Sequence, residues 1–187
     1  AVRALRKEFP EHPIVVDLKT MDGGYLEAEM MADAGADAVI VMARAHEATI
    51  EAVIEAGERF GMLVMGDDLA EADRVAACVR MEQLGVGMVI HHIGYDHRNK
   101  HPEFGLSPLT ELSDIVAATT VPVQAVGGLT IDQAVSCPEV GAPVVVFGAP
   151  LAIDGKTFSP ASGDLGKVLT EAAARVHAAQ IRYPAAV

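Results

Sequence analysis

Short runs of branched apolar residues alternate with amphipathic stretches along this chain, and glycine marks most of the boundaries. Four segments share one order, a helix-like stretch, a glycine and a short apolar run, at 34–41, 60–65, 84–90 and 140–146. Two further apolar runs lie at 13–17 and 121–126. Glycine suits the left-handed position just past a helix, and a short apolar run suits a fully buried parallel strand. The pattern therefore predicts six parallel strands separated by helices.

The spacing of the repeats indicates one continuous α/β domain over residues 1–187. Gly35, Gly61 and Gly85 lie roughly 25 residues apart, which is about one βα unit. Residues 49–60 have Ile50, Val53 and Ile54 on one helical face. Strands that alternate with helices form either a barrel or a doubly wound sheet. Composition does not change along the chain in a way that would mark a linker.

Two glycine turns favour an α/β barrel of the (β/α)₈ type. Gly127-Gly128 and Gly148-Ala149 follow the last two apolar runs. In such barrels the loops after strands seven and eight commonly bind phosphate through backbone N–H groups. Counting back makes the 13–17 run strand three, and residues 1–9 resemble the end of a helix. We therefore expect a barrel that lacks its first two βα units in this chain, with open strand edges.

Charged residues concentrate around the first apolar run. Asp17 and Lys19 are two residues apart, so their side chains leave a strand on the same face, and Asp22 follows in the next loop. Three charges in six residues also occur in ordinary solvated clusters, with Asp22 as a helix N-cap. Directly after a buried strand, however, such charges cost several kcal/mol unless they are paired or used. This position favours a catalytic role.

Composition narrows the possible partners and the compartment. The chain is 51% hydrophobic with 4% aromatic residues and no tryptophan, and its formal charge is −12. Nucleic acid is an unsuitable partner because its binding needs a basic surface. Apolar runs are too short to span a membrane. Cys78 and Cys137 form no CxxC motif, which favours a reducing cytoplasm.

The run Asp17-Leu18-Lys19-Thr20-Met21-Asp22-Gly23-Gly24 resembles the signature of the 3-hexulose-6-phosphate synthase family. That family shares the DxKxxD motif and a ribulose-phosphate-binding barrel with 3-keto-L-gulonate-6-phosphate and orotidine-5′-phosphate decarboxylases. The resemblance extends over nearly the whole chain, through 34–37, Thr49-Ile50, His92-x-Gly94-x-Asp96 and 126–128. The Lys-Thr-Met-Asp and His-x-Gly-x-Asp motifs favour the synthase over the gulonate decarboxylase.

This resemblance implies an aldol-type addition of formaldehyde to D-ribulose 5-phosphate, which gives D-arabino-3-hexulose 6-phosphate. It implies Mg²⁺, with Mn²⁺ as a possible substitute, held by Asp17 and stabilising an enediolate. Lys19 would then act on the developing oxyanion. Asp22 would reach the partner's site across a homodimer interface and keep that lysine charged. In the resembling family, a Glu at the end of strand two shares the metal with Asp17. Because this chain lacks that strand, we expect weak Mg²⁺ binding and little turnover unless a separate piece completes the barrel.

His92 is the candidate proton shuttle, because imidazole titrates near neutral pH. His91 is adjacent, and neighbouring strand residues face opposite ways, so only one can enter the barrel; the family spacing favours His92. The alternative is a structural histidine under a loop. Gly127, Gly128, Gly148 and Ala149 are the expected phosphate-binding positions, although a glycine pair is often only a turn.

Two segments depart from the family pattern. The family places an Asp in a Val-Val-Asp run on strand five, whereas this chain reads Val64-Met65-Gly66-Asp67-Asp68. Either Asp67 fills that role or the role is lost. The loop over 95–108 has no counterpart, and its histidines, which could suggest a transition-metal tract, lack ligand spacing and favour a polar loop.

The sequence is also compatible with two alternative functions. One is decarboxylation of a 3-keto sugar-acid phosphate, which uses the same metal, lysine and enediolate. The other is a non-catalytic phospho-ligand-binding domain of a larger fused protein, suggested by the altered strand five and the histidine-rich loop.

Overall fold

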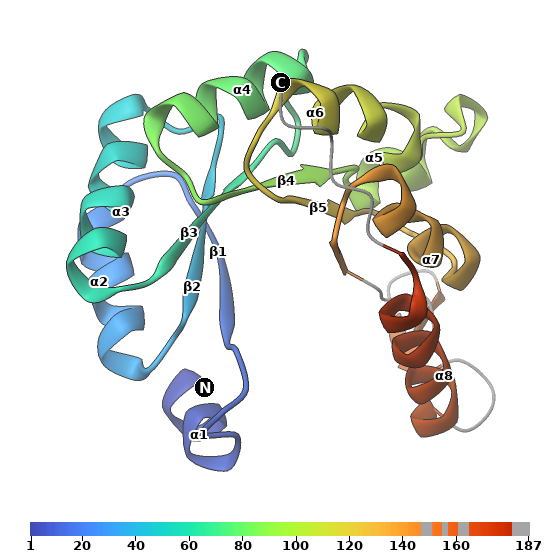
Figure 1. Cartoon of the computed structure of the whole chain (residues 1–187), viewed down its shortest axis with the longest axis horizontal. Coiled ribbons are helices and arrows are strands. Elements are labelled where there is room, and N and C mark those ends of the chain that lie inside the picture. Colours follow the sequence, from blue (N-terminus) through green and yellow to red (C-terminus); the bar gives the residue numbers. More distant parts are fainter. Residues whose placement is uncertain (147–150, 155–156, 161–164, 181–187) are drawn as a thin grey trace.

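A curled sheet of six parallel strands forms the centre of the computed structural model (Figure 1). The structure describes residues 1–146, 151–154, 157–160 and 165–180. Neighbouring strands follow chain order: β1 (Val15–Thr20), β2 (Ala38–Met42), β3 (Leu63–Asp67), β4 (Met88–His92), β5 (Val123–Val126) and β6 (Val144–Val146). The six predicted strands and their parallel pairing are confirmed.

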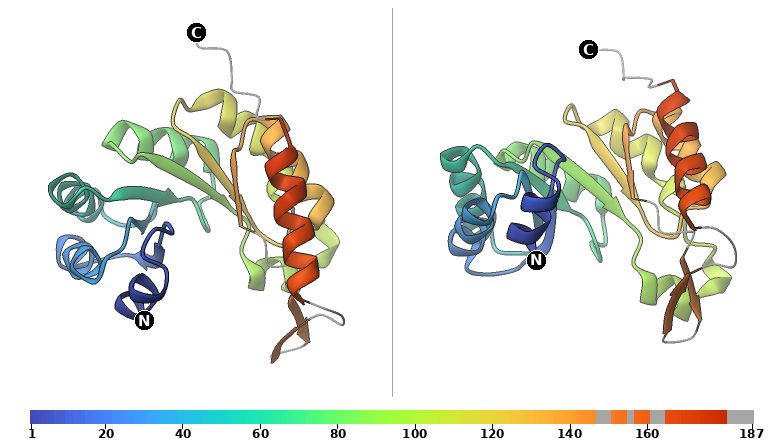
Figure 2. Two further views of the ribbon diagram at one scale, coloured as in Figure 1. Left: turned by 60° about the horizontal axis from the view of Figure 1, so that its bottom comes forward. Right: turned by 90° about the horizontal axis from the view of Figure 1, so that it is seen from below.

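Most helices lie on the outer side of the curved sheet, while the helix that follows β4 lies beyond the end of that strand (Figures 1 and 2). Their bounds are α1 (Val2–Glu8), α2 (Gly24–Ala34), α3 (Glu47–Phe60), α4 (Arg74–Leu84), α5 (Tyr95–Lys100), α6 (Leu112–Ala118), α7 (Ile131–Val140) and α8 (Leu165–Ala178). Two short 3₁₀ helices, η1 (Pro102–Phe104) and η2 (Pro108–Thr110), lie between α5 and α6. Among the described residues, no helix has the length and apolar character needed to cross a membrane.

Successive side chains along each strand point alternately into two apolar layers, one on each face of the sheet. Side chains on the outer face pack under the helices and include Val39, Val41, Val64, Val89 and Ala125. The inner face has a smaller buried cluster of Ala38, Ile40, Met65 and Ile90. Because both faces are apolar, these strands appear in the sequence as continuous hydrophobic runs.

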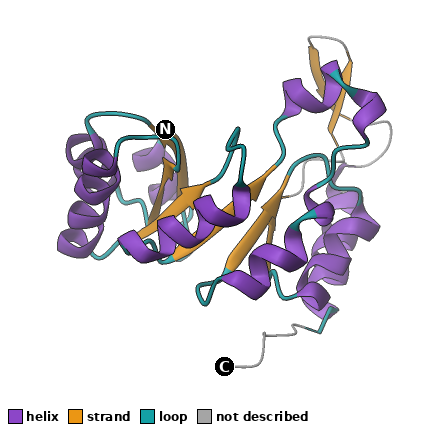
Figure 3. Ribbon diagram, turned by 90° about the horizontal axis from the view of Figure 1, so that it is seen from above, coloured by secondary structure: helices purple, strands orange, loops and turns teal. Residues whose placement is uncertain are grey.

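The open, curled sheet agrees with the expected incomplete barrel. Figure 3 shows the helices on one side of the strands, whereas a doubly wound sheet has helices on both faces. β1 and β6 are the outermost strands of the described sheet. A separate antiparallel pair, β7 (Leu151–Asp154) with β8 (Thr157–Pro160), was not predicted from the sequence.

The predicted helix stops are also confirmed. Gly35, Gly61 and Gly141 end α2, α3 and α7 with φ of 94°, 70° and 111°. Positive φ is costly for residues with a Cβ, so these glycines fix where each helix gives way to the next strand.

Gly24 sets the close approach of α2 to α3. A Cβ at this position would lie 2.6 Å from the Thr49 carbonyl oxygen and 2.7 Å from Val53 Cγ2. Gly24→Ala is therefore expected to lower the free energy of unfolding by about 1–3 kcal/mol through overpacking, measured by urea denaturation. Asp33→Ala on the same helix, where the residue is exposed, is the control. Equal unfolding midpoints for wild type and Gly24→Ala would show that the two helices separate without cost.

Candidate active site

β1 is irregular where the charged residues lie. Its register with β2 runs from Val16 opposite Val39 to Thr20 opposite Val41, so the strand bulges between these two pairs. Lys19 lies in this bulge with φ of 51°, one of two non-glycine residues with positive φ in the part of the chain that is described. A left-handed residue with a Cβ costs roughly 1–2 kcal/mol, and such strain is often found at functional sites.

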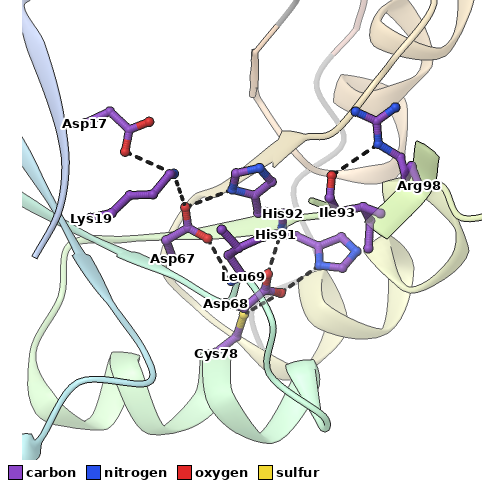
Figure 4. Close-up of polar contacts among 10 residues, drawn as sticks. All are labelled: Asp17, Lys19, Asp67, Asp68, Leu69, Cys78, His91, His92, Ile93 and Arg98. Atoms are coloured by element: carbon purple, nitrogen blue, oxygen red, sulfur yellow. Dashed lines mark hydrogen bonds and ion pairs between the residues drawn. The ribbon is translucent and has the colours of Figure 1, made fainter. Parts of the chain in front are cut away.

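Lys19 lies between two carboxylates at the mouth of the sheet (Figure 4). Its Nζ is 3.1 Å from Asp17 Oδ1 and 3.1 Å from Asp67 Oδ2. The Asp67 side chain is 1% exposed, whereas that of Asp17 is 55% exposed. One carboxylate is therefore a buried anchor for the ammonium group and the other remains open to solvent.

The surroundings keep the Lys19–Asp67 pair ionised. Burial alone lowers the pKa of Lys19, but Asp67 and Asp17 outweigh it and raise that pKa above its ordinary value. Burial alone raises the pKa of Asp67, but His92, Lys19 and the Leu69 N–H together hold that pKa below the usual carboxyl range. Lys19 is thus a fixed cation throughout the neutral pH range.

His92 completes this cluster from the end of β4. Its Nδ1 lies 3.0 Å from Asp67 Oδ2, so an ionised Asp67 favours the tautomer with a proton on Nδ1 and leaves Nε2 able to accept a proton. Asp17, Lys19, Asp67 and His92 all line one cavity of about 280 Å³ on the inner face of the sheet. Gln124, Val126 and Val146 line the same cavity from the neighbouring strands.

The adjacent residues Asp68 and His91 face the opposite way. His91 Nδ1 lies 2.7 Å from Asp68 Oδ2, and both side chains are almost fully buried on the helix side of the sheet. Asp68 Oδ1 also accepts the backbone N–H of His92 at 2.7 Å. Burial, with a further contribution from Asp68, raises the pKa of the nearby Cys78 thiol. The pair Asp68–His91 is therefore a structural support beneath the cavity.

The structure thus distinguishes the two histidines. His92, rather than His91, enters the barrel interior, as the spacing favoured. Asp67 lies at the cavity, at the end of β3. This strand corresponds to strand five of the complete barrel, where the sequence left the position of the family's Asp in doubt. The role of Asp68 was missed, because only the contact between β3 and β4 shows that it supports His91.

Asp22 lies away from the cluster within this chain. Its side chain accepts the Gly23 N–H at 2.8 Å, and Gly23, rather than Asp22, is the N-cap of α2. Among the described residues, the carboxylates that contact Lys19 are Asp17 and Asp67. Three apolar side chains in the segment from residue 21 to residue 30 are at least half exposed: Met21, Leu26 and Met30.

The turn after β5 has the geometry expected of a close backbone approach. Gly127 and Gly128 have φ of 135° and 68°, and a Cβ on Gly127 would lie 2.6 Å from the Ile93 carbonyl oxygen. Thr130 then caps α7 in a reciprocal capping box with Gln133. The other two positions expected to bind phosphate, Gly148 and Ala149, lie outside the described residues.

The 95–108 segment folds as α5 and η1 rather than as an irregular loop. Its histidines contact an aromatic ring: His101 stacks on Phe104 at 4.9 Å between ring centroids, and His97 meets His101 edge-on. Across the described part of the chain, no group of three or more His, Cys, Asp or Glu residues could hold a metal ion. These histidines therefore form a small stacked cluster.

A half-barrel with a lysine between two carboxylates at its strand ends belongs to a recognised class of (β/α)-barrel enzymes. Residues 1–151 match the family model described as orotidine 5′-phosphate decarboxylase / HUMPS family, and this chain belongs to that family. The 3-hexulose-6-phosphate synthase of Methylomonas aminofaciens is 31% identical over 151 residues, which cover 80% of this chain and 70% of that protein.

Solved structures show the same fold. The 3-hexulose-6-phosphate synthase of Salmonella typhimurium has a TM-score of 0.77 at 24% identity and covers 94% of this chain and 80% of its own. The 3-keto-L-gulonate-6-phosphate decarboxylase of Vibrio cholerae has a TM-score of 0.73 at 21% identity, with 95% and 78% coverage. This chain matches the backbones of both enzymes about equally well, so the fold alone does not distinguish their reactions.

Proposed function

We propose that this chain is a 3-hexulose-6-phosphate synthase, an aldehyde-lyase that adds formaldehyde to D-ribulose 5-phosphate. The observation that carries the proposal is Lys19, held between Asp17 and Asp67 beside His92 in a chain 31% identical to a synthase. Asp67 in the cavity also argues against a non-catalytic binding domain, which the altered run on β3 and the histidine-rich loop had together suggested.

The hard step is removal of a proton from carbon 1 of the ketose. His92 Nε2 would accept that proton, while Asp67 stabilises the imidazolium through Nδ1. Lys19 would donate a hydrogen bond to the oxygen on which the enediolate charge develops; a fixed cation helps here because it needs no reorganisation during the reaction.

Carbon 1 then attacks formaldehyde and a carbon–carbon bond forms. The formaldehyde oxygen becomes an alkoxide, and His92 returns its proton to that oxygen, so the enzyme ends in its starting state. One histidine thus serves as base and then as acid, in keeping with its position beside the ionised Asp67.

We propose that Mg²⁺, or Mn²⁺ in its place, takes part through Asp17. The exposed Asp17 carboxylate is a hard oxygen donor at the cavity mouth, and Mg²⁺ typically binds to one or two carboxylates together with substrate oxygens. When bound, the ion would supply Lewis-acid stabilisation of the enediolate. Because the described residues offer few further donors, Asp17 would hold the ion mainly together with substrate.

The proposal includes a homodimer in which Asp22 approaches the partner's cavity. Leu26 and Met30 are 66% and 62% exposed and lie one helical turn apart on α2, the helix that follows Asp22 in the chain. Such an apolar surface supports burial against a second copy. The free, buried Cys78 and Cys137 support the proposed location in a reducing cytoplasm.

The direct test follows formaldehyde consumption by the full-length protein with ribulose 5-phosphate in the presence of Mg²⁺ or Mn²⁺. We expect consumption that depends on all three components and a hexulose phosphate as product. No consumption with either metal would reject the synthase assignment. Release of carbon dioxide from 3-keto-L-gulonate 6-phosphate would favour the decarboxylase instead.

Subunit complementation tests the position of Asp22. An Asp22→Ala protein and an Asp17→Ala protein should each be inactive, yet the mixed dimer should recover about half of wild-type activity, because one of its two composite sites is intact. The measurement is activity after co-expression with two affinity tags and purification of the heterodimer. Inactive heterodimers would indicate that each site is built from one chain.

A further inference from the structure

Arg98 on α5 places its guanidinium group against the glycine turn that follows β5. A Cβ built on Gly128 would overlap with Nη1 of Arg98 and lie 2.5 Å from its Cζ. The guanidinium therefore contacts the Gly128 backbone from the side that a Cβ would occupy. In Figure 4, Arg98 appears on the opposite side of His92 from Asp17 and Lys19.

The positive charge of Arg98 is poorly compensated. Its Nε donates to the Ile93 carbonyl oxygen at 3.3 Å, and its Cζ lies 5.9 Å from the Tyr95 ring centroid. Among the described residues, its two terminal nitrogens have no hydrogen-bond partner and no carboxylate pairs with it. By contrast, Arg74 is paired with Glu111 at 2.5 Å and Arg175 with Asp132 at 2.7 Å. Burial lowers the pKa of Arg98 below its ordinary value, as expected for a half-buried cation without an anion.

The Nε–Ile93 bond also orients the side chain. Ile93 directly follows the proton-transferring His92, and its carbonyl oxygen packs on Gly127. One short segment therefore fixes the guanidinium relative to both the proposed base and the glycine turn. The two terminal nitrogens can therefore donate bidentate hydrogen bonds to a tetrahedral or planar anion.

We infer that Arg98 is the cation that binds the substrate phosphate above the Gly127-Gly128 turn. This inference deepens the proposed function, on which it rests, by assigning an anion-binding side chain to a cradle otherwise made of backbone. It also gives a role to the 95–108 segment, which brings a local positive charge into a chain with a formal charge of −12.

The test measures binding of inorganic phosphate and of ribulose 5-phosphate by isothermal titration calorimetry, without turnover. Arg98→Ala should weaken both by about 10- to 100-fold, since one charge-assisted contact is lost. Lys100→Ala removes an exposed cation from the same helix and should change neither. Arg98→Lys should give an intermediate loss, because one charge remains without the fork.

A second variant tests the geometry while keeping the arginine. Gly128→Ala should displace the guanidinium and weaken phosphate binding to a similar extent. Gly61→Ala is its matched control, since Gly61 has nearly the same φ of 70° but open space around it. Wild-type phosphate affinity in folded Arg98→Ala would overturn the inference and leave the synthase proposal intact. Phosphate binding through Arg98 without formaldehyde consumption would support the inference and reject the synthase.

Discussion

Lys19→Met is expected to lower kcat by about 100- to 1,000-fold while the affinity for ribulose 5-phosphate falls by less than about tenfold. Asp17 and Asp67 hold the lysine at the cavity mouth, and under the proposed mechanism it acts mainly on charge that develops in the transition state. Loss of such a group lowers kcat and kcat/KM together. Steady-state kinetics and direct titration of the sugar phosphate separate the two effects.

Two controls make this result specific. Lys100→Met removes a lysine outside the cavity and should leave kcat unchanged. Methionine keeps a side chain at the strained φ of 51°, so an unfolding curve for Lys19→Met will show whether the fold is intact. A folded Lys19→Met protein that loses mainly substrate affinity would identify the lysine as a simple anion anchor.

Asp68→Ala should lower the free energy of unfolding by about 3–5 kcal/mol, the largest stability effect that we expect from a single substitution. Removing one partner of a buried, hydrogen-bonded pair leaves the other uncompensated, here His91 Nδ1 together with the His92 N–H. Urea denaturation measures the loss. In the native protein His91 Nε2 already has no hydrogen-bond partner among the described residues. Loss of Asp68 would therefore leave both ring nitrogens of His91 without a partner.

Asp73→Ala is the matched control for that experiment. Asp73 is a nearby aspartate whose side chain only caps α4, by accepting the Ala76 N–H at 3.0 Å. Its loss should cost about 1 kcal/mol. Equal destabilisation by the two substitutions would show that Asp68 contributes no more than a surface cap, and Asp68→Ala combined with His91→Ala would then be additive.

Much of the fold could be predicted from the sequence, because a parallel sheet buried on both faces leaves a simple signature. The apolar runs gave all six strands, and Gly35, Gly61 and Gly141 gave the helix ends. Local signals of this kind depend on a few adjacent residues. The β7–β8 pair was missed, as its strands are four residues each and lack a clear alternation.

The site was predictable only in part, because its geometry comes from contacts between strands. The motif identified Asp17 and Lys19, and alternation allowed only one of His91 and His92 to face inward. The sequence could not show that Asp67 contacts both Lys19 and His92, because Lys19 and His92 are 48 and 25 positions from Asp67 in the chain. The position of Arg98 over Gly128 likewise depends on how α5 packs, which periodicity does not indicate.

The bulge in β1 bears on how this site could change by mutation. Ladder pairing holds Val16 and Thr20 in place, while the residues between them, which include Asp17 and Lys19, are released from strict register. Substitutions within that interval can therefore alter the chemistry at the cavity mouth without shifting the rest of the sheet. We expect libraries randomised at Asp17 and Lys19 to retain folded members far more often than libraries randomised at Val39 and Val41 on the paired strand, so the bulge separates the evolution of activity from the maintenance of the fold.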